Sequence, residues 1–191
     1  SDFRVQEVRI VYPTYAPRLI AVPVDLGHEA AKMGSSANTT GMPVMTFARY
    51  PSLENTVVYI TGGASGIGAE IVRAFAAQGS KVGFFDFDAE AGEQLRAELA
   101  GGDATVQFES VDLRDIEALK AAFASMQAGL GAAQVLVNNA ARDDRHGWET
   151  VTADYYDERI ATNLRHMFFA IQTVAPGMIE AGKGSIINMG S

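Results

Sequence analysis

The stretch that most constrains the fold is Val57–Gly68, where an apolar, β-branched run ends at the glycine-rich turn Gly-Gly-Ala-Ser-Gly-Ile-Gly. An amphipathic helix is predicted directly after this turn, because Ile67, Ile71, Val72 and Phe75 recur on one face with a period of about 3.6 residues. A strand, a glycine turn and a helix together present free backbone N–H groups and the positive end of a helix dipole to a phosphate. The spacing Gly-x-x-x-Gly-x-Gly differs from the commonest dinucleotide fingerprint, so a purely structural turn remains an alternative.

A carboxylate follows the next predicted strand. The apolar run Lys81 to Phe85 ends in Asp86, 18 residues after Gly68. An acidic residue near this distance from the glycine turn is typical of one that binds the adenosine ribose of a nicotinamide dinucleotide. Because an acid also repels a 2′-phosphate, the sequence favours NAD over NADP. Asp88, which directly precedes the run Ala89 to Leu99, is the better candidate for capping that helix.

Strand and helix patterns alternate from Val57 onward, and such alternation predicts right-handed βαβ crossovers. The expected elements are 57–61, 66–78, 81–86, 89–100, 104–109, 114–128, 134–138, 153–181 and 185–189. We therefore predict an α/β fold with a doubly wound, Rossmann-like parallel sheet that is incomplete at its C-terminal end.

The first 48 residues do not share this pattern. Short strands are conceivable at 8–12 and 19–24, but prolines interrupt them, and 34–41 is typical of a loop or linker. We therefore divide the chain into an irregular N-terminal extension of unknown role, 1–48, and a dinucleotide-binding domain, 49–191.

Composition limits the functional classes. The 191 residues are 48% hydrophobic, enough for one sizeable core, and the net charge of −8 argues against nucleic-acid or anionic-membrane partners. Cysteine is absent, no histidine lies at a metal-ligand spacing from another, and no run is long enough to span a bilayer. We expect a cytoplasmic protein without a bound metal.

Polar residues follow the later strands, where ligands bind in sheets of this type. Asp112 follows the third strand and could either cap the next helix or accept a hydrogen bond from an adenine. Asn138 and Asn139 follow the fourth strand and suit either a turn against a flat ligand or an ordinary Asx-turn. Asn163 interrupts an apolar stripe of the long helix 153–181, so its amide either bonds locally to the backbone or serves a polar site.

Taken together, these motifs resemble the short-chain dehydrogenase/reductase family in order and spacing over about 49–191. The residues that carry the resemblance are Thr61 to Gly68, Asp86, Asp112, Asn138-Asn139-Ala140, Asn163 and Gly184 to Asn188. A finer likeness to bacterial dehydrogenases that oxidise aldoses such as D-xylose, L-arabinose or galactose at C1 lies in 143–146, 156–160, 163–167 and 175–178.

The resemblance implies a role for each matching position. The cofactor phosphates would contact Gly62, Ser65, Gly66, Ile67 and Gly68; the ribose Asp86; the adenine Asp112 and Leu113; and the adenosine side Asn139 and Ala140. Asn163 would be the catalytic asparagine that helps to place a water, and Ser191 the serine that orients the substrate hydroxyl. Sugar hydroxyls could meet Asp143, Arg145 and His146, although an ordinary surface loop is an equal alternative for His146. For His166 we expect a packing role, and the resemblance suggests a homo-oligomer, a tetramer.

The sequence departs from the family pattern at two places. Ala141 replaces the last glycine of Asn-Asn-Ala-Gly, a change that should preserve the turn. None of the six tyrosines is followed by lysine four residues later, whereas the family's Tyr-x-x-x-Lys base lies beyond the serine. We therefore expect a fragment of an enzyme whose last strand, 185–189, is an unpaired edge. A regulatory NAD-binding module or a structural partner remain the alternatives.

Overall fold

The structure is a computed structural model that describes residues 5–9, 48–102, 104–144 and 146–190. Backbone contacts divide the chain into two compact units, one made of Ser1–Ile10 and Arg49–Ser191 and the other of Val11–Ala48. All helices and strands that the structure describes belong to the first unit. The predicted linker at 34–41 and the possible strand at 19–24 lie outside the described residues. The division at residue 48 therefore stays a prediction.

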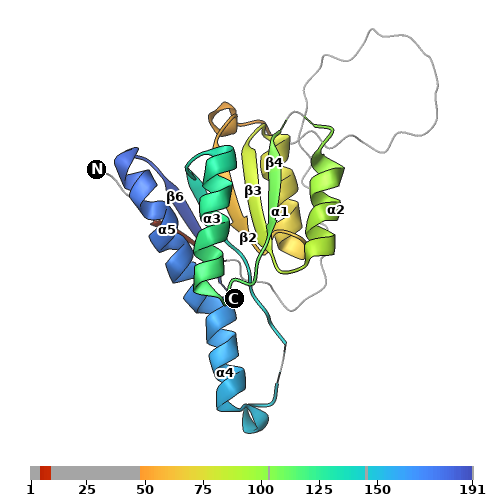
Figure 1. Ribbon diagram of the computed structural model, residues 1–191, viewed down its shortest axis with the longest axis vertical. Coiled ribbons are helices and arrows are strands. Elements are labelled where there is room, and N and C mark those ends of the chain that lie inside the picture. Colours follow the sequence, from red (N-terminus) through yellow and green to blue (C-terminus); the bar gives the residue numbers. More distant parts are fainter. Residues whose placement is uncertain (1–4, 10–47, 103, 145, 191) are drawn as a thin grey trace, which may run out of the picture. The chain divides into compact units, whose positions relative to one another are not determined.

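Strands and helices alternate along the first unit (Figure 1). In chain order the elements are β1 (Val5–Arg9), a 3₁₀ turn (Pro51–Leu53), β2 (Val57–Thr61), α1 (Gly66–Ala77), β3 (Lys81–Asp86), α2 (Ala89–Leu99), β4 (Val106–Ser110), α3 (Ile116–Leu130), β5 (Val135–Asn138), a 3₁₀ turn (Trp148–Thr150), α4 (Ala153–Ile160), a π-helical turn (Ala161–Arg165), α5 (His166–Glu180) and β6 (Ser185–Gly190).

The strands form one parallel sheet in the order β1-β6-β5-β2-β3-β4. This confirms the predicted doubly wound sheet. The chain moves from β2 outward to β3 and β4 and then crosses back to β5 on the other side of β2, so the winding direction reverses between β2 and β5. Thr61 is level with Phe85 on one side and Asn138 on the other, which brings the carboxyl ends of three strands together at this reversal.

Helices cover both faces of the sheet, with α1 and α2 on one face and α3 and α5 on the other (Figure 1). The central strand β2 is buried at every residue, and its side chains alternate between two apolar clusters. Val58 and Ile60 pack toward α1, whereas Tyr59 packs edge-on against Phe85 and Phe123 on the α3 face. The all-apolar strand pattern therefore reflects burial on both faces.

Aspartates cap two of the helices. Asp88 accepts a hydrogen bond from the backbone N–H of Ala91, which confirms its predicted role at the start of α2. The cap of α3 is Asp115, which accepts from Glu117 and Ala118. The reading of Asp112 as that cap is therefore wrong, because α3 begins two residues later than expected and its own Asp115 lies next to the first turn.

The long helix predicted at 153–181 is continuous but changes its winding at Ala161–Arg165, which forms a π-helical turn. Such a turn adds a residue and shifts the phase of the helix faces. The predicted apolar stripe is therefore buried only in α5, at Ala170 and Val174, whereas Tyr156 and Ile160 in α4 are exposed.

The edge next to β6 is occupied by β1, which pairs with it in parallel from Val5 opposite Ile186 to Arg9 opposite Gly190. The expectation that the last strand is an unpaired edge is therefore wrong. The N-terminal strand lies at 5–9 rather than at 8–12. A pairing between strands so far apart in the sequence leaves no local trace, which is why the pattern of residues 1–48 gave no sign of it.

Candidate active site

A pocket with a volume of about 540 Å³ lies at the carboxyl ends of β2, β3, β4 and β5, where the winding direction reverses. Its lining comes from the glycine turn, from the segments after β3, β4 and β5, and from α4 and the π-helical turn. The lining residues are Gly62, Ser65–Gly68, Asp86, Phe87, Val111–Arg114, Asn139–Asp143, Glu158 and Thr162. The predicted cofactor residues Gly62, Ser65, Gly66, Ile67, Gly68, Asp86, Asp112, Leu113, Asn139 and Ala140 are thus brought together in one site.

Two glycines of the turn are required by close packing. Gly62 has a positive φ of 66°, and a Cβ there would lie 2.6 Å from the Cα of Ala140. A Cβ on Gly68 would lie 1.8 Å from the carbonyl oxygen of Gly62, so only glycine lets the first turn of α1 pack against the loop.

Gly66 serves a different purpose, because it has a φ of 52° and a Cβ there would meet nothing within 4 Å. This glycine borders open space at the start of α1 within the pocket. Ser65 at the N-cap makes no side-chain hydrogen bond to the helix. The first backbone N–H groups of α1 are therefore left without a side-chain cap and lie next to the pocket, as in helix ends that bind phosphates.

Asp86 joins the glycine turn to the end of β3. Its side chain is buried, and its Oδ2 accepts from the backbone N–H of Ala64 at 3.0 Å while Oδ1 accepts from that of Asp88 at 3.1 Å. Two backbone donors hold the carboxylate at the pocket wall and leave further lone pairs for ligand hydroxyls.

The end of β5 is fastened to the glycine turn by hydrogen bonds. The buried hydroxyl oxygen of Thr61 accepts from the backbone N–H groups of Asn139 at 3.0 Å and Ala140 at 3.2 Å. The Asn139 amide nitrogen donates to the carbonyl of Gly62 at 2.9 Å, and that of Asn138 donates to Asn188 Oδ1 on β6 at 2.9 Å. The two asparagines therefore hold three strand ends in place, which extends the turn roles considered from the sequence.

Asp112 forms a two-point ion pair with Arg114. The Arg114 guanidinium donates to both carboxylate oxygens at 2.6 to 3.0 Å, and its backbone N–H donates to Oδ1 at 3.0 Å. Hydrogen bonds from the Arg114 side chain lower the pKa of Asp112 below its usual value. The carboxylate that was predicted to face adenine is thus already held in its charged form by a neighbour.

The Asn163 side chain clamps the loop after β5. Its Oδ1 accepts from the backbone N–H of Arg142 at 2.8 Å, and its Nδ2 donates to the carbonyl of the same residue at 2.9 Å. The π-helical turn carries this amide toward the loop, so both of its polar atoms bind backbone. The direct contribution of this side chain is thus to position the loop.

His166 begins α5 and is fully buried. Neither ring nitrogen makes a well-formed hydrogen bond among the described residues. Burial lowers the pKa of His166 to about 4, and the nearby backbone of Thr162 opposes this only in part. The imidazole is therefore neutral at physiological pH and packs in the interior, as the sequence suggested.

The predicted sugar-binding residues are only partly described. Asp143 lines the pocket and is exposed, whereas the His146 ring packs on Tyr155 with ring centroids 4.2 Å apart. Arg145 and the predicted catalytic Ser191 lie outside the described residues. Within the described ranges no group of His, Asp or Glu side chains could hold a metal ion, and no helix is long and apolar enough to cross a membrane.

Known proteins are similar to this chain in sequence and in fold. Residues 56–191 match the family model of short chain dehydrogenases. The chain belongs to this family. It is 50% identical over 147 residues to a D-xylose 1-dehydrogenase of Caulobacter vibrioides, covering 77% of this chain and 58% of the relative. It is also 48% identical over 146 residues to a probable galactose dehydrogenase of Rhizobium meliloti, covering 75% and 57%.

Solved structures of this family share the fold. A solved short-chain dehydrogenase/reductase mutant from Serratia marcescens superimposes with a TM-score of 0.67 at 34% identity, covering 74% of this chain and 57% of that one. The chain thus spans somewhat more than half the length of the relatives it matches.

The sequence reasoning gave no individual site role to Arg114, Arg142 and Glu158, which line the pocket, or to Thr61, which holds the loop after β5. Thr61 ends a strand, so its polar side chain at the boundary of an apolar run was an available signal. The three charged residues carry no such signal, because most arginines and glutamates at these positions of a helix or loop face solvent.

Proposed function

We propose that this protein is an NAD-dependent oxidoreductase that removes hydride from a hydroxyl-bearing carbon, C1 of an aldose sugar, to give a lactone. The observation that carries the proposal is the convergence of the glycine turn, Asp86 and Asn139 on one pocket, in a chain 50% identical over 147 residues to a D-xylose 1-dehydrogenase. The finer points, NAD rather than NADP and an aldose rather than another alcohol, rest on Asp86 and on the relatives.

The pocket fits a nicotinamide dinucleotide. The open amino end of α1 and the space above Gly66 suit a pyrophosphate, and the fixed carboxylate of Asp86 suits two ribose hydroxyls. When bound, the nicotinamide supplies the hydride acceptor. The protein supplies orientation: Thr61 and Asn139 hold the turn at the phosphates, and Asn163 fixes the loop on the sugar side.

Proton removal from the sugar hydroxyl needs a base, which the family resemblance assigns to a tyrosine assisted by a lysine. A second candidate is an NAD-binding regulatory or structural module, which would use the same pocket without such a base. The two candidates differ in a measurable way. The module binds NAD in calorimetry without any sugar-dependent formation of NADH.

The test uses the protein expressed from its complete open reading frame. NADH formation is followed by absorbance with D-xylose, L-arabinose, D-galactose and other alcohols, with NAD and with NADP. Sugar-dependent NADH with a lactone product supports the dehydrogenase. Tight NAD binding without turnover on any sugar, alcohol or keto substrate with either cofactor would overturn it in favour of the module.

Cofactor preference is tested at Asp86. We expect Asp86→Asn to raise the ratio of NADP to NAD affinity roughly tenfold, because it removes a charge that repels the 2′-phosphate while keeping hydrogen bonding to the ribose. Glu90→Gln, an exposed change of the same charge on α2, is the matched control and should leave the ratio unchanged. An unchanged ratio in Asp86→Asn would place the ribose elsewhere.

We also propose a homo-oligomer, a tetramer by the family resemblance. Large exposed apolar side chains along α4, the π-helical turn and α5 support association: Tyr156, Ile160, Leu164 and Phe168. Light scattering on the complete protein tests this, and a monodisperse monomer at micromolar concentration would contradict it.

A further inference from the structure

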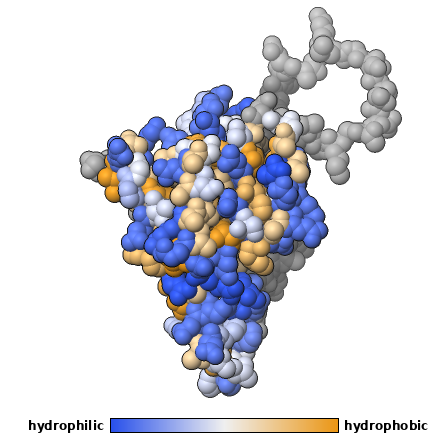
Figure 2. Space-filling view, viewed as in Figure 1, coloured by the Kyte–Doolittle hydropathy of each residue, from blue (hydrophilic) through white to orange (hydrophobic). Residues whose placement is uncertain are grey.

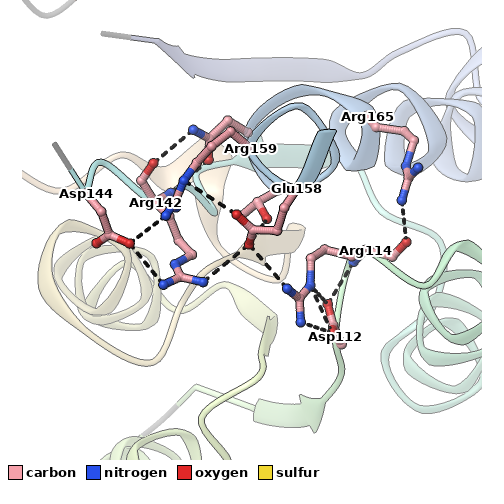
Figure 3. A network of polar contacts seen from close by, with 9 residues as sticks. Asp112, Arg114, Arg142, Asp144, Glu158, Arg159 and Arg165 are labelled. Carbon is pink, nitrogen blue, oxygen red and sulfur yellow. Dashed lines mark hydrogen bonds and ion pairs between the residues drawn. The ribbon is translucent and has the colours of Figure 1, made fainter. Parts of the chain in front are cut away.

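The loop after β5 returns to α4 through a group of charged side chains (Figure 3). One member of the group is Asp144, whose Oδ2 accepts from Arg142 Nη2 at 3.0 Å and from Arg159 Nη2 at 2.6 Å. The backbone carbonyl of Asp144 also accepts from the Tyr155 hydroxyl at 2.9 Å. Main chain and side chain of this one residue are therefore both fastened to α4.

Arg159 depends on Asp144 for its hydrogen bonding. Its side chain is only 14% exposed and lies over the Tyr155 ring, 4.6 Å from the centroid. Nε lies 3.4 Å from Glu158 Oε2, but neither Nε nor Nη1 makes a hydrogen bond within the described part of the chain. Removing the Asp144 charge would leave a mostly covered guanidinium without its short partner.

Glu158 connects this group to the pocket wall. Its Oε1 accepts from Arg142 Nη1 at 3.3 Å, from Arg114 Nη1 at 3.2 Å and from the Thr162 hydroxyl at 3.2 Å. Glu158, Arg142 and Arg114 all line the pocket, whereas Asp144 does not. We call Asp144, Arg142, Glu158, Arg159 and Tyr155 the Asp144 clasp.

The two consecutive acids of the loop therefore do different things. Asp143 lines the pocket and makes no side-chain hydrogen bond described by the structure, so it is free to meet a substrate hydroxyl. Asp144 is not part of the pocket lining, and its carboxylate binds the guanidinium groups of Arg142 and Arg159. The hydrogen bond from Arg159 holds the pKa of Asp144 below its usual value. A residue so occupied acts on the substrate only through its neighbours.

We propose that Asp144 is a positioning residue that fixes the loop after β5 on α4 and thereby orients Arg142 and Asp143 for sugar binding. The inference rests on the proposed dehydrogenase function and deepens it, because it assigns sugar affinity to a contact outside the pocket. The cofactor side of the pocket has its own hydrogen bonds at Thr61 and Asp86, so its affinity is independent of the clasp.

The experiment compares Asp144→Asn with the wild-type protein from the complete open reading frame. We expect the KM for the sugar to rise roughly tenfold, with kcat and the KM for NAD within about twofold, since substrate binding is weakened and the reacting groups are unchanged. Hydrogen exchange of the backbone amides between residues 142 and 152 should accelerate, while exchange in 61–68 stays the same. Asp144→Glu keeps the charge and should restore most of the affinity.

Glu93→Gln is the matched control, because Glu93 forms a similar half-exposed ion pair with Arg96 on α2, away from the pocket. It should change neither the sugar KM nor the exchange. If Asp144→Asn changes neither the sugar KM nor the exchange, this inference is overturned and the proposed function is unaffected. A fall in kcat with unchanged KM overturns it too, since it would place Asp144 in the chemical step. Absence of sugar oxidation by the wild-type protein overturns the proposed function instead, and the exchange measurement still judges the clasp.

Discussion

The two sides of the pocket are held by different kinds of interaction. On the cofactor side, the turn at 61–68 is fixed by backbone packing and buried hydrogen bonds, such as that from Gly62 N–H to the Phe85 carbonyl at 2.7 Å. On the proposed substrate side, the loop after β5 is fixed to α4 by ion pairs between arginine and carboxylate side chains, most of which are partly exposed. The visible surface at the end where Figure 1 places α4 is accordingly mostly hydrophilic (Figure 2).

This difference matches the demands of the two proposed ligands. A dinucleotide is the same in every enzyme that uses it, so a rigid backbone cradle serves it well. Side-chain ion pairs can be exchanged by single substitutions without disturbing the fold, so they allow a substrate side to change while the cofactor side remains. The unfolding free energy should therefore fall strongly with small changes of shape on the rigid side, and only weakly with changes of charge on the proposed substrate side.

The largest effect is expected from Gly68→Ala. The new Cβ would overlap the Gly62 carbonyl, so the turn must move, and we expect a loss of about 3 kcal/mol or more in unfolding free energy with NAD binding weakened roughly 100-fold. Urea denaturation and calorimetry measure both.

Gly66→Ala is the comparison for this change, because its Cβ meets nothing and only the positive φ opposes it, at about 1 kcal/mol. Equal stability losses at the two positions would show that backbone conformation rather than close packing governs the turn.

The next effect concerns the pH dependence of stability and comes from His166, which is fully buried at the start of α5. Its pKa in the folded protein, about 4, lies below the value near 6.5 of an exposed imidazole, so the unfolded chain binds the extra proton first. His166 thus lowers stability progressively as the pH falls from about 6.5 to about 4, by up to about 3 kcal/mol. Above this range it has no effect on the pH dependence.

Urea denaturation at several pH values measures this slope, with His166→Gln and the exposed His146→Gln compared. The slope should shrink in His166→Gln only. If instead both variants kept the full slope, the acid sensitivity would belong to other groups.

The contrast between the two sides also decides what the sequence could predict. The glycine turn, Asp86 and the Asp88 cap are local features, since each depends on residues within one strand–turn–helix unit, and all three lie where the pattern placed them. The parallel sheet followed from the alternation of elements. A short-range pattern was enough for the cofactor side.

Other contacts depend on which distant segments meet. Thr61 accepts hydrogen bonds from Asn139 and Ala140, which lie 78 and 79 positions later in the sequence. Arg114 contacts Glu158, which lies 44 positions later. No periodic pattern in the sequence indicates these contacts. The pairing of β1 with β6 joins the two ends of the first unit. For the Asn163 amide the sequence left a backbone bond and a polar site open, and its partner, the backbone of Arg142, lies 21 positions away and is reached from a π-helical turn that the sequence does not signal.

The smallest effect is expected from Arg114→Gln. The Arg114–Asp112 pair is nearly half exposed on both sides, so solvent screening limits its contribution to the unfolding free energy to about 0.5 kcal/mol. The lowered pKa of Asp112 means that this contribution is present above about pH 4 and is lost as the pH falls through the carboxyl's folded value. Urea denaturation of both proteins at neutral pH in about 0.05 M and about 1 M salt should show a difference that shrinks in high salt. A loss above about 2 kcal/mol that persists in high salt would mean that the charged contacts of the pocket rim are as structural as the glycine turn, and the contrast between the two sides would fail.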